Sequence, residues 1–157
     1  MDIIALDLAT EMGVYTGDGR PYAIKFEKET RSINYWAFIC EKAPLFDVVV
    51  FEDAIGQRGH ALEVFHEFKS LTKLACDLAD TVLVGVSPAH IKKVFTGNGR
   101  ASKEDVIEKC LSMGLDVPSR VLKGGPDKGK VRYNDNAADA AAIYHTFLID
   151  EGIDEWR

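Results

Sequence analysis

The most restrictive feature of this sequence is a pair of short apolar runs, each of which contains or ends at an acidic residue. Residues 3–9 read IIALDLA, and residues 46–52 read FDVVVFE, which is almost entirely apolar until Glu52. A run that is apolar at every position, rather than at alternate positions, is typical of a central strand with helices on both of its faces. The second run therefore predicts an α/β fold with the sheet inside the molecule.

The other segments predict the rest of this sheet. Residues 12–17 and 22–27 follow the first run across short glycine-containing turns, so the first three strands are expected to be antiparallel. Residues 46–52 and 81–87 are expected to be parallel strands that alternate with helices, which gives a five-stranded mixed sheet with helices on both faces. Helices are predicted at 32–43 with Ser32 as the cap, 61–80, 88–94, 102–113, and from Asn134 or Asp135 to about 149, and the glycine-rich residues 116–133 are predicted to be a basic loop.

Length and composition favour one domain, residues 1–157. A chain of 157 residues with 46% apolar residues is long enough to bury a core. No apolar stretch approaches the roughly 20 residues that span a bilayer, and the N-terminus lacks a secretory leader pattern. Cys40, Cys76 and Cys110 are widely spaced, which suits reduced thiols. We therefore expect a protein of the cytoplasm, or of the host cytoplasm if the chain is viral, with no membrane partner.

Three acidic residues stand at positions where apolar side chains are expected. Asp7 interrupts the first strand, Glu52 ends the most apolar strand, and Asp139 lies in an alanine-rich helix that should pack closely on the sheet. A solvated strand end would explain Glu52 alone. Burying several carboxylates without partners costs several kcal/mol. A bound cation is the simplest explanation of all three together.

The expected topology allows the three acids to meet. If the first and fourth strands pair in parallel, Asp7 and Glu52 lie about 4.8 Å apart laterally at one edge, which the last helix then crosses. Asp135 and Asp139 are four residues apart and Asn136 and Asp139 are three apart, so either pair shares a helical face. An all-oxygen cluster favours Mg²⁺, with Mn²⁺ as a substitute. Such sites, with two ions, hydrolyse phosphodiesters by in-line displacement.

The motifs resemble those of a known family. DLATEMG with Asp7, VVVFEDA with Glu52, SPAHIKKVFTGNGRASKEDV with Lys92 and Lys103, and DNAADAAAI with Asp139 resemble the RuvC Holliday junction resolvases of the ribonuclease H-like superfamily, and look most like the compact bacteriophage versions. The resemblance covers residues 1 to about 149. It implies a homodimeric, Mg²⁺-dependent endonuclease that cuts four-way and branched DNA in recombination, repair or phage genome processing. It carries the metal-ligand role directly to Asp7, Glu52 and Asp139.

Two departures from the family pattern bear on the site. The family's fourth ligand, an Asp or His three residues before the last Asp, corresponds here to Asn136, whose neutral amide ligates hard cations more weakly. Asp135 either supplies the missing charge or caps the helix. The aromatic residue that follows the Glu in bacterial members is absent, so that a wedge into the junction would be Ile55 or a residue of the following loop.

The charge distribution predicts where DNA binds. The net charge of −6 argues against a polyanionic partner only if the charges are evenly spread. Residues 88–132 instead hold ten basic and five acidic residues, and their glycine-containing segments flank the proposed metal site. Lysines beside such backbone amides hold phosphates without reading sequence. The predicted DNA-binding residues are Lys92, Lys93, Arg100, Lys103, Lys123, Lys128, Lys130 and Arg132.

Two other functions remain open from the sequence. A broader ribonuclease H-like nuclease would cut flaps, branched DNA or RNA–DNA hybrids, because substrate choice depends on loops and dimer geometry. A catalytically weak DNA-binding module on the same fold would account for Asn136. Metal dependence and the preference among branched substrates distinguish these alternatives.

Overall fold

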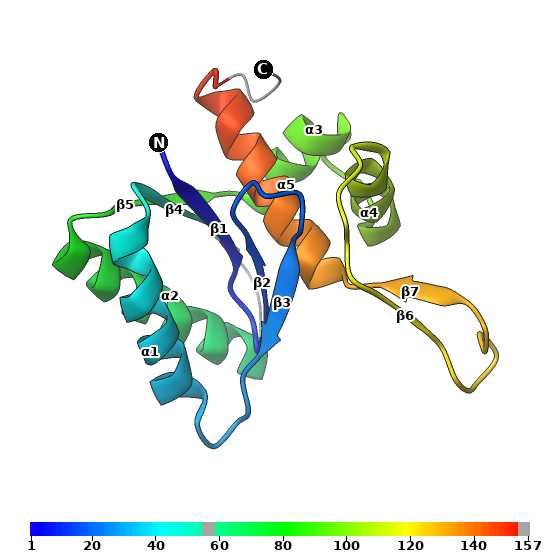
Figure 1. The fold of residues 1–157 in the computed structure, drawn as a ribbon, viewed down its shortest axis with the longest axis horizontal. Helices are drawn as coiled ribbons and strands as arrows, with labels where there is room; N and C mark the ends of the chain where they lie inside the picture. The colour runs from blue at the N-terminus through cyan, green and yellow to red at the C-terminus, as the bar shows by residue number, and fades with distance from the viewer. Residues whose placement is uncertain (55–58, 154–157) are drawn as a thin grey trace.

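The computed structural model describes residues 1–54 and 59–153, and a five-stranded sheet lies at its centre (Figure 1). The strand order is β3-β2-β1-β4-β5. β1 pairs with β2, and β2 with β3, in antiparallel register, whereas β1 with β4 and β4 with β5 are parallel. The predicted mixed sheet is thus confirmed, including the parallel pairing of the first and fourth strands. The strands are β1 Ile3–Asp7, β2 Glu11–Tyr15, β3 Tyr22–Lys25, β4 Val48–Glu52 and β5 Val82–Val86.

Helices cover both faces of this sheet, as expected. One face carries α1 and α2, and the other carries α5, on which α3 and α4 pack (Figure 1). Among the described residues, no helix combines the length and the apolar character that crossing a membrane requires. The helices are α1 Arg31–Lys42, followed by a 3₁₀ turn Ala43–Leu45, α2 His60–Ala79, α3 Pro88–Thr96, α4 Lys103–Ser112 and α5 Asp135–Asp150.

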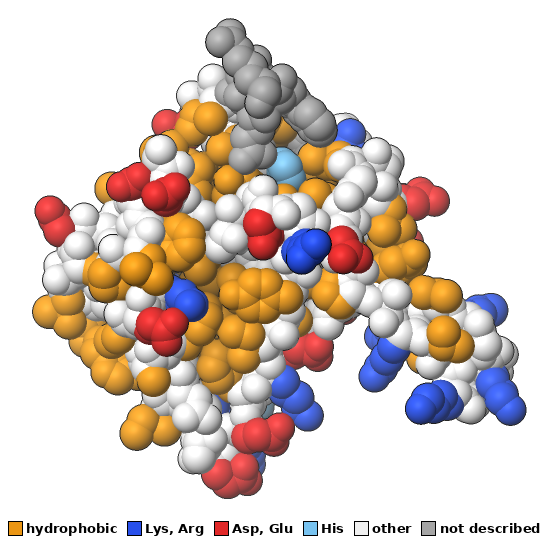
Figure 2. Space-filling view, in the orientation of Figure 1, with side chains coloured by type: hydrophobic (Ala, Val, Ile, Leu, Met, Phe, Trp, Pro, Cys, Tyr) orange, Lys and Arg blue, Asp and Glu red, His pale blue; other side chains and the backbone are white. Residues whose placement is uncertain are grey.

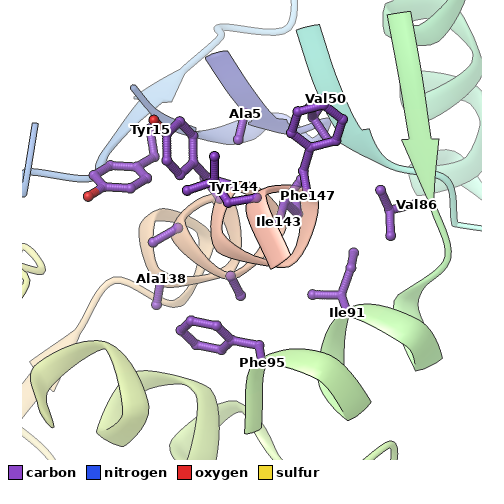
Figure 3. Packing of buried hydrophobic residues seen from close by; sticks show 14 of the residues in the cluster. Ala5, Tyr15, Val50, Val86, Ile91, Phe95, Ala138, Ile143, Tyr144 and Phe147 are labelled. Carbon is purple, nitrogen blue, oxygen red and sulfur yellow. The ribbon is translucent and has the colours of Figure 1, made fainter. Parts of the chain in front are cut away.

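The alternation of side chains along β1 and β4 divides the core into two layers. Successive residues of a strand point to opposite faces. Ile4 and Leu6 of β1 therefore pack toward α1 and α2, whereas Ile3 and Ala5 pack toward α5. Figure 3 shows the second layer, in which Ile143, Tyr144 and Phe147 of α5 lie among side chains of the sheet and of α3. Both faces of the central strands are buried, which explains their unbroken apolar sequence.

Helix α5 lies unusually close to the sheet at Gly13 of β2. A Cβ atom at Gly13 would lie 1.8 Å from the backbone oxygen of Asn136 and 3.1 Å from the Cβ of Ala140. Real Cβ atoms do not approach backbone atoms so closely, so only glycine fits at this position. The alanines of α5 are fully or almost fully buried and present no long side chain that would hold the helix away. Gly13 pairs with Asp7 in the register of β1 and β2, so this contact brings α5 beside Asp7.

The helix ends follow local sequence signals, with one exception. The predicted cap at Ser102 forms a full capping box with Asp105, and Asn134 caps α5 through a side-chain oxygen that accepts from the Ala137 amide. The exception is α1, which starts at Arg31 after Thr30 rather than after Ser32. The Ser32 hydroxyl instead donates to Glu67 of α2, so a tertiary contact takes the place of the predicted cap.

The segment 116–133 is not simply a loop, which corrects the prediction. It contains a two-stranded antiparallel hairpin, β6 Ser119–Val121 and β7 Val131–Tyr133, that projects from the body of the protein (Figure 1). Each strand has only three residues, and three glycines and two prolines are spread through the segment. The prediction failed because such short strands carry almost no periodic signal.

We expect Gly13→Ala to destabilise the protein by about 2–3 kcal/mol, because the added methyl group must push α5 away from β2. Gly124→Ala is the matched control, since a Cβ at Gly124 meets no atom within 4 Å, and its effect should stay within about 0.5 kcal/mol. Urea unfolding measured by circular dichroism gives both values. Equal stabilities for the two variants would contradict the close contact at Gly13.

Candidate active site

The predicted acids of β1 and β4 lie on the α5 side of the sheet. Val48 and Val50 belong to the α5 layer of the core, as Ile3 and Ala5 do, so Asp7 and Glu52 continue the same two rows of side chains. The parallel register pairs the residues just before them, which makes Asp7 and Glu52 neighbours at the ends of adjacent strands. Two strands thus direct carboxylates into the narrow space beneath α5.

Helix α5 completes this site from above. Asp139 and Asn136 line the same cleft as Asp7 and Glu52, and the volume of this cleft is about 450 Å³. The two α5 residues are three apart, which places both on the helix face that meets the sheet. The other residues lining the cleft are Leu8, Ala9, Thr10, Ala61, Val64 and Lys103. The structure therefore brings together Asp7, Glu52, Asn136 and Asp139.

Burial makes these carboxylates unusually hard to ionise. Removal from water, together with the charges of Asp139 and Glu52, raises the pKa of Asp7 well above its ordinary range. Burial and the charge of Glu52 raise the pKa of Asp139 to about 7. Burial also raises the pKa of Glu52. The cleft thus gathers three carboxyl groups, and burial is the largest cause of the raised pKa of each.

Two lysines supply the positive charge at this cleft. Lys103, the first residue of α4, lies among the lining residues, and its charge lowers the pKa values of Asp7, Glu52 and Asp139. Lys92 of α3 acts on Glu52 and Asp139 in the same direction. Both lysines are predicted to bind phosphate; Lys103 lines the cleft, and Lys92 is near enough for its charge to act on two of the acids.

Asp135 occupies a different position from the other acids. Its carboxylate forms an ion pair with Lys103, and it lines the surface beside the hairpin rather than the acid cleft. Burial alone would raise the pKa of Asp135, but the hydrogen bond and the charge of Lys103, together with a backbone hydrogen bond and the charge of Arg132, lower it overall. Asn134, and not Asp135, caps α5. Of the two candidates for the fourth ligand, Asn136 therefore faces the cleft, and Asp135 holds Lys103.

The donor chemistry of the cleft fits a hard divalent cation. The oxygen-bearing side chains that line it are three carboxylates, the Asn136 amide and the Thr10 hydroxyl, without histidine or cysteine, which suits Mg²⁺ or Mn²⁺. In the described ranges 1–54 and 59–153, however, no three Asp, Glu, His or Cys side chains already converge at the spacing of a closed metal site. The metal-ligand roles of Asp7, Glu52, Asn136 and Asp139 therefore remain predictions that the burial and charge of the cleft favour.

The remaining predicted DNA-binding residues lie farther from the cleft. Lys93 and Arg100 are exposed on α3 and on the loop after it. The other four belong to the hairpin segment, where Figure 2 shows Lys and Arg side chains gathered on the projection. These are Lys123, Lys128, Lys130 and Arg132, and Lys130 forms an ion pair with Asp127.

Sequence reasoning overlooked two features around Glu52. Asp53 binds Lys69 of α2 at 2.8 Å, which ties the end of β4 to the opposite layer, and an acid directly after Glu52 was the available signal. Thr10 lines the cleft from the turn after Asp7, within a motif already singled out. The predicted wedge residue Ile55 lies outside the described residues.

Comparisons with solved structures identify the fold. Thermus thermophilus RuvC superposes with a TM-score of 0.69 at 19% sequence identity, over 98% of both chains. T. thermophilus RuvC in complex with Holliday junction substrate gives a TM-score of 0.70 at 19% identity, over 98% of this chain and 97% of that chain. No protein-family model and no curated protein sequence matches the chain. The protein therefore has a RuvC-like, ribonuclease H-like fold.

The raised pKa of Asp139 predicts how stability depends on pH without metal. A carboxyl group with a pKa of about 7 in the folded state and 3.8 as its ordinary value binds more protons when folded, so stability falls as pH rises from about 4 to about 7. In EDTA, we expect the melting temperature to fall by about 5 °C between pH 5 and pH 7.5. Differential scanning fluorimetry measures this fall.

The same measurement on variants assigns the effect to the cleft. In Asp139→Asn the fall should be clearly smaller, although Asp7 and Glu52 still contribute. Glu29→Gln removes an exposed acid outside the cleft and should behave as the wild type does. An identical pH dependence in the wild type and Asp139→Asn would show that Asp139 ionises normally.

Proposed function

We propose that this protein is a structure-selective endodeoxyribonuclease that cuts four-way and other branched DNA junctions by metal-dependent phosphodiester hydrolysis. The observation that carries the proposal is the convergence of Asp7, Glu52 and Asp139 in one cleft of a RuvC-like fold, with Lys92 and Lys103 beside them. A solved RuvC structure of similar fold is a complex with Holliday junction substrate, which supports a four-way junction as the DNA class.

We propose Mg²⁺ as the cofactor, with Mn²⁺ as a substitute, held by Asp7, Glu52, Asp139 and Asn136. Bound divalent ions would activate a water molecule and stabilise the leaving oxygen of an in-line displacement. Because the carboxyl groups are partly removed from water, their attraction for a cation that enters the cleft would be stronger than at an exposed surface. The convergence of buried carboxylates is therefore functional in this proposal rather than a defect of the core.

The lysines and Asp135 have separate roles in this mechanism. Lys92 and Lys103 would hold the phosphates that flank the cut, because their ammonium groups are the basic groups that act on the carboxylates. Asp135 positions the Lys103 ammonium group through their ion pair. This pair raises the pKa of Lys103, so the lysine stays protonated at neutral pH and available to a phosphate.

Four-way junctions require two cuts on opposed strands, which a symmetric homodimer supplies. We therefore propose that the active form is a homodimer, working in recombination, in repair or in phage genome processing. The bacteriophage type, and with it a place in the host cytoplasm, belongs to the same proposal. Its support is the compact motif pattern of the sequence.

One observation favours a second candidate. The cleft offers the neutral amide of Asn136 where a further carboxylate would bind hard cations more strongly. A catalytically weak protein that binds branched DNA on the same fold is the function this amide favours. Cleavage measurements distinguish the two candidates, because both predict junction binding but only the first predicts metal-dependent products.

The proposal predicts that Asp7→Asn lowers junction cleavage by about 1,000-fold or more, equivalent to about 4 kcal/mol, while the affinity for DNA is kept. The substrates are labelled four-way junction, replication fork, nicked duplex and RNA–DNA hybrid, in Mg²⁺ and then in Mn²⁺. Asp18→Asn, an exposed acid in the turn after β2, is the control and should cut normally. Paired symmetric nicks confined to the junction are expected.

Two outcomes would contradict this function. Unaltered cleavage by Asp7→Asn would remove the acid cleft from the chemistry. Equal cutting of hybrids or forks by the wild type would instead indicate a nuclease of broader substrate range.

Replacing Asn136 with Asp should lower the Mg²⁺ concentration needed for half-maximal cleavage by about tenfold, because a carboxylate binds hard cations more strongly than an amide does. Asp135→Asn is the comparison, since it removes a charge that pairs with Lys103 and should change the Mg²⁺ requirement less. Titration of Mg²⁺ in the cleavage assay gives both values. A larger effect of Asp135→Asn would make Asp135 the fourth ligand.

A further inference from the structure

The hairpin β6/β7 is ordered although it belongs to no larger sheet. An isolated hairpin is at best marginally stable in water, so its anchors matter. At its base the Asn134 amide donates to the Pro118 carbonyl at 2.8 Å, and the Asn134 side chain donates to Glu11 at 2.8 Å. Toward its tip, Leu122 exchanges backbone hydrogen bonds with Gly129 and Lys130. The result is a defined ribbon, about 13 Å long at 3.3 Å per residue.

The two faces of this ribbon differ in chemistry. Arg120 and Arg132 are direct partners across the strands, so both side chains lie on one face. The next pair, Val121 and Val131, lies on the other face. Tyr133 shares the valine face and packs at the edge of the α5 layer, whereas Val121 and Val131 are exposed, so the ribbon is attached to the body at its base.

Placing two arginines directly opposite one another is unfavourable for the hairpin itself, because like charges across a strand pair repel. Both arginines are exposed, and in the described part of the chain no carboxylate lies within ion-pair distance of either. The hairpin's own acid, Asp127, is paired with Lys130. Lys123 and Lys128 add exposed positive charge at the tip. The arrangement fits an anionic partner outside the protein.

The surface between the hairpin and the acid cleft is continuous. Lys103 lines the acid cleft, and it also lines a groove of about 360 Å³ together with Val131 and Arg132 of the hairpin. The acids Glu104, Glu108 and Asp135 line the same groove, and Asp135 is already paired with Lys103. A second hollow, lined by Arg120 and Arg132, adjoins Asp135, the partner of Lys103. A nucleic-acid strand with one phosphate at the acid cleft would therefore run past Lys103 onto the ribbon.

We propose that the hairpin β6/β7 binds the double-stranded DNA arm that continues from the cut strand, with its arginine face on the phosphodiester backbone and the ribbon in the major groove. A two-stranded β-ribbon fits the width of that groove. The inference rests on the proposed function in its choice of DNA, and it adds the element that holds the duplex arm. The hairpin thereby contributes affinity for duplex next to the cut rather than chemistry.

The test measures DNA binding by the full chain in EDTA, so that no cleavage is needed. Fluorescence anisotropy gives the Kd of wild type and of Arg120→Gln/Arg132→Gln for a four-way junction, a linear duplex and a single strand. We expect about tenfold weaker binding of the junction and the duplex, and a change below about twofold for the single strand. The slope of log K against log salt should become shallower by about 2, since each lost phosphate contact removes about 0.9.

Two further variants serve as controls. Arg120→Lys/Arg132→Lys keeps the charge and should keep most of the wild-type salt slope. Lys28→Gln/Lys73→Gln removes two exposed charges from the turn before α1 and from α2, away from the hairpin, and should weaken binding by less than about twofold. Thermal unfolding should show that removing the arginine pair leaves the melting temperature unchanged or raises it, because the pair repels itself.

Three results would overturn the inference. The first is wild-type affinity of Arg120→Gln/Arg132→Gln for duplex and junction. The second is an equal loss of affinity in the control Lys28→Gln/Lys73→Gln. The third is an equal loss of affinity of Arg120→Gln/Arg132→Gln for single strand, which would exclude binding in a duplex groove. These results are independent of the proposed nuclease function. If the wild type cuts junctions in a metal-dependent way and the hairpin variant binds DNA normally, only the proposed role of the hairpin is contradicted. If binding depends on the hairpin but no cleavage occurs, only the proposed nuclease function is contradicted.

Discussion

The site depends on the contact between α5 and β2 at Gly13. Because residue 13 has no Cβ, the backbone of α5 at Asn136 lies directly against the strand that pairs with Asp7. A helix that packs on a sheet through larger side chains stands several ångströms farther away. At that distance Asp139 would lie farther from Asp7 and Glu52. The missing Cβ at residue 13 thus allows α5 to bring Asp139 close to the two acids of the sheet.

This geometry opposes stability, because it buries like charges together. Asp7 and Asp139 both bind protons more readily than free carboxyl groups do, which indicates that the folded protein is strained electrostatically when the cleft holds no cation. Lys103 offsets part of that charge, but Asp135 also holds its ammonium group. A divalent ion would neutralise the remaining negative charge of the carboxylates, so this uncompensated charge would favour metal binding. In the proposed enzyme the bound metal would then serve phosphodiester hydrolysis.

Charge is separated along the surface from the cleft outward. The cleft holds three acids, and Lys103 lies at its border, where Glu104, Glu108 and Asp135 are also found. The projecting hairpin beyond it carries basic side chains, which Figure 2 shows, with one acid. Such an order suits a substrate whose backbone is negative everywhere but is cut at one position. The net charge of −6 conceals this arrangement, since the whole-chain sum adds regions of opposite sign.

The sequence alone was sufficient for the sheet and for the candidate acids. Nearly unbroken apolar runs are typical of central strands that are covered on both faces. An acid within or at the end of such a run is unexpected there, which is why Asp7 and Glu52 could be identified as candidates. The capping box at Ser102 was equally readable, because its signal is confined to four residues.

Only the tertiary structure decided how these parts meet. It showed that Asn136 faces the cleft while Asp135 turns to Lys103, a choice between adjacent positions of one helix that depends on the rotation of α5 against the sheet. It also showed a hairpin within 116–133, where Arg120 and Arg132 become partners only once the strands pair. Local sequence determines which secondary structure each segment prefers. Which side chains of different segments face one another depends on how the segments pack, and residues far apart in the chain contribute to that packing.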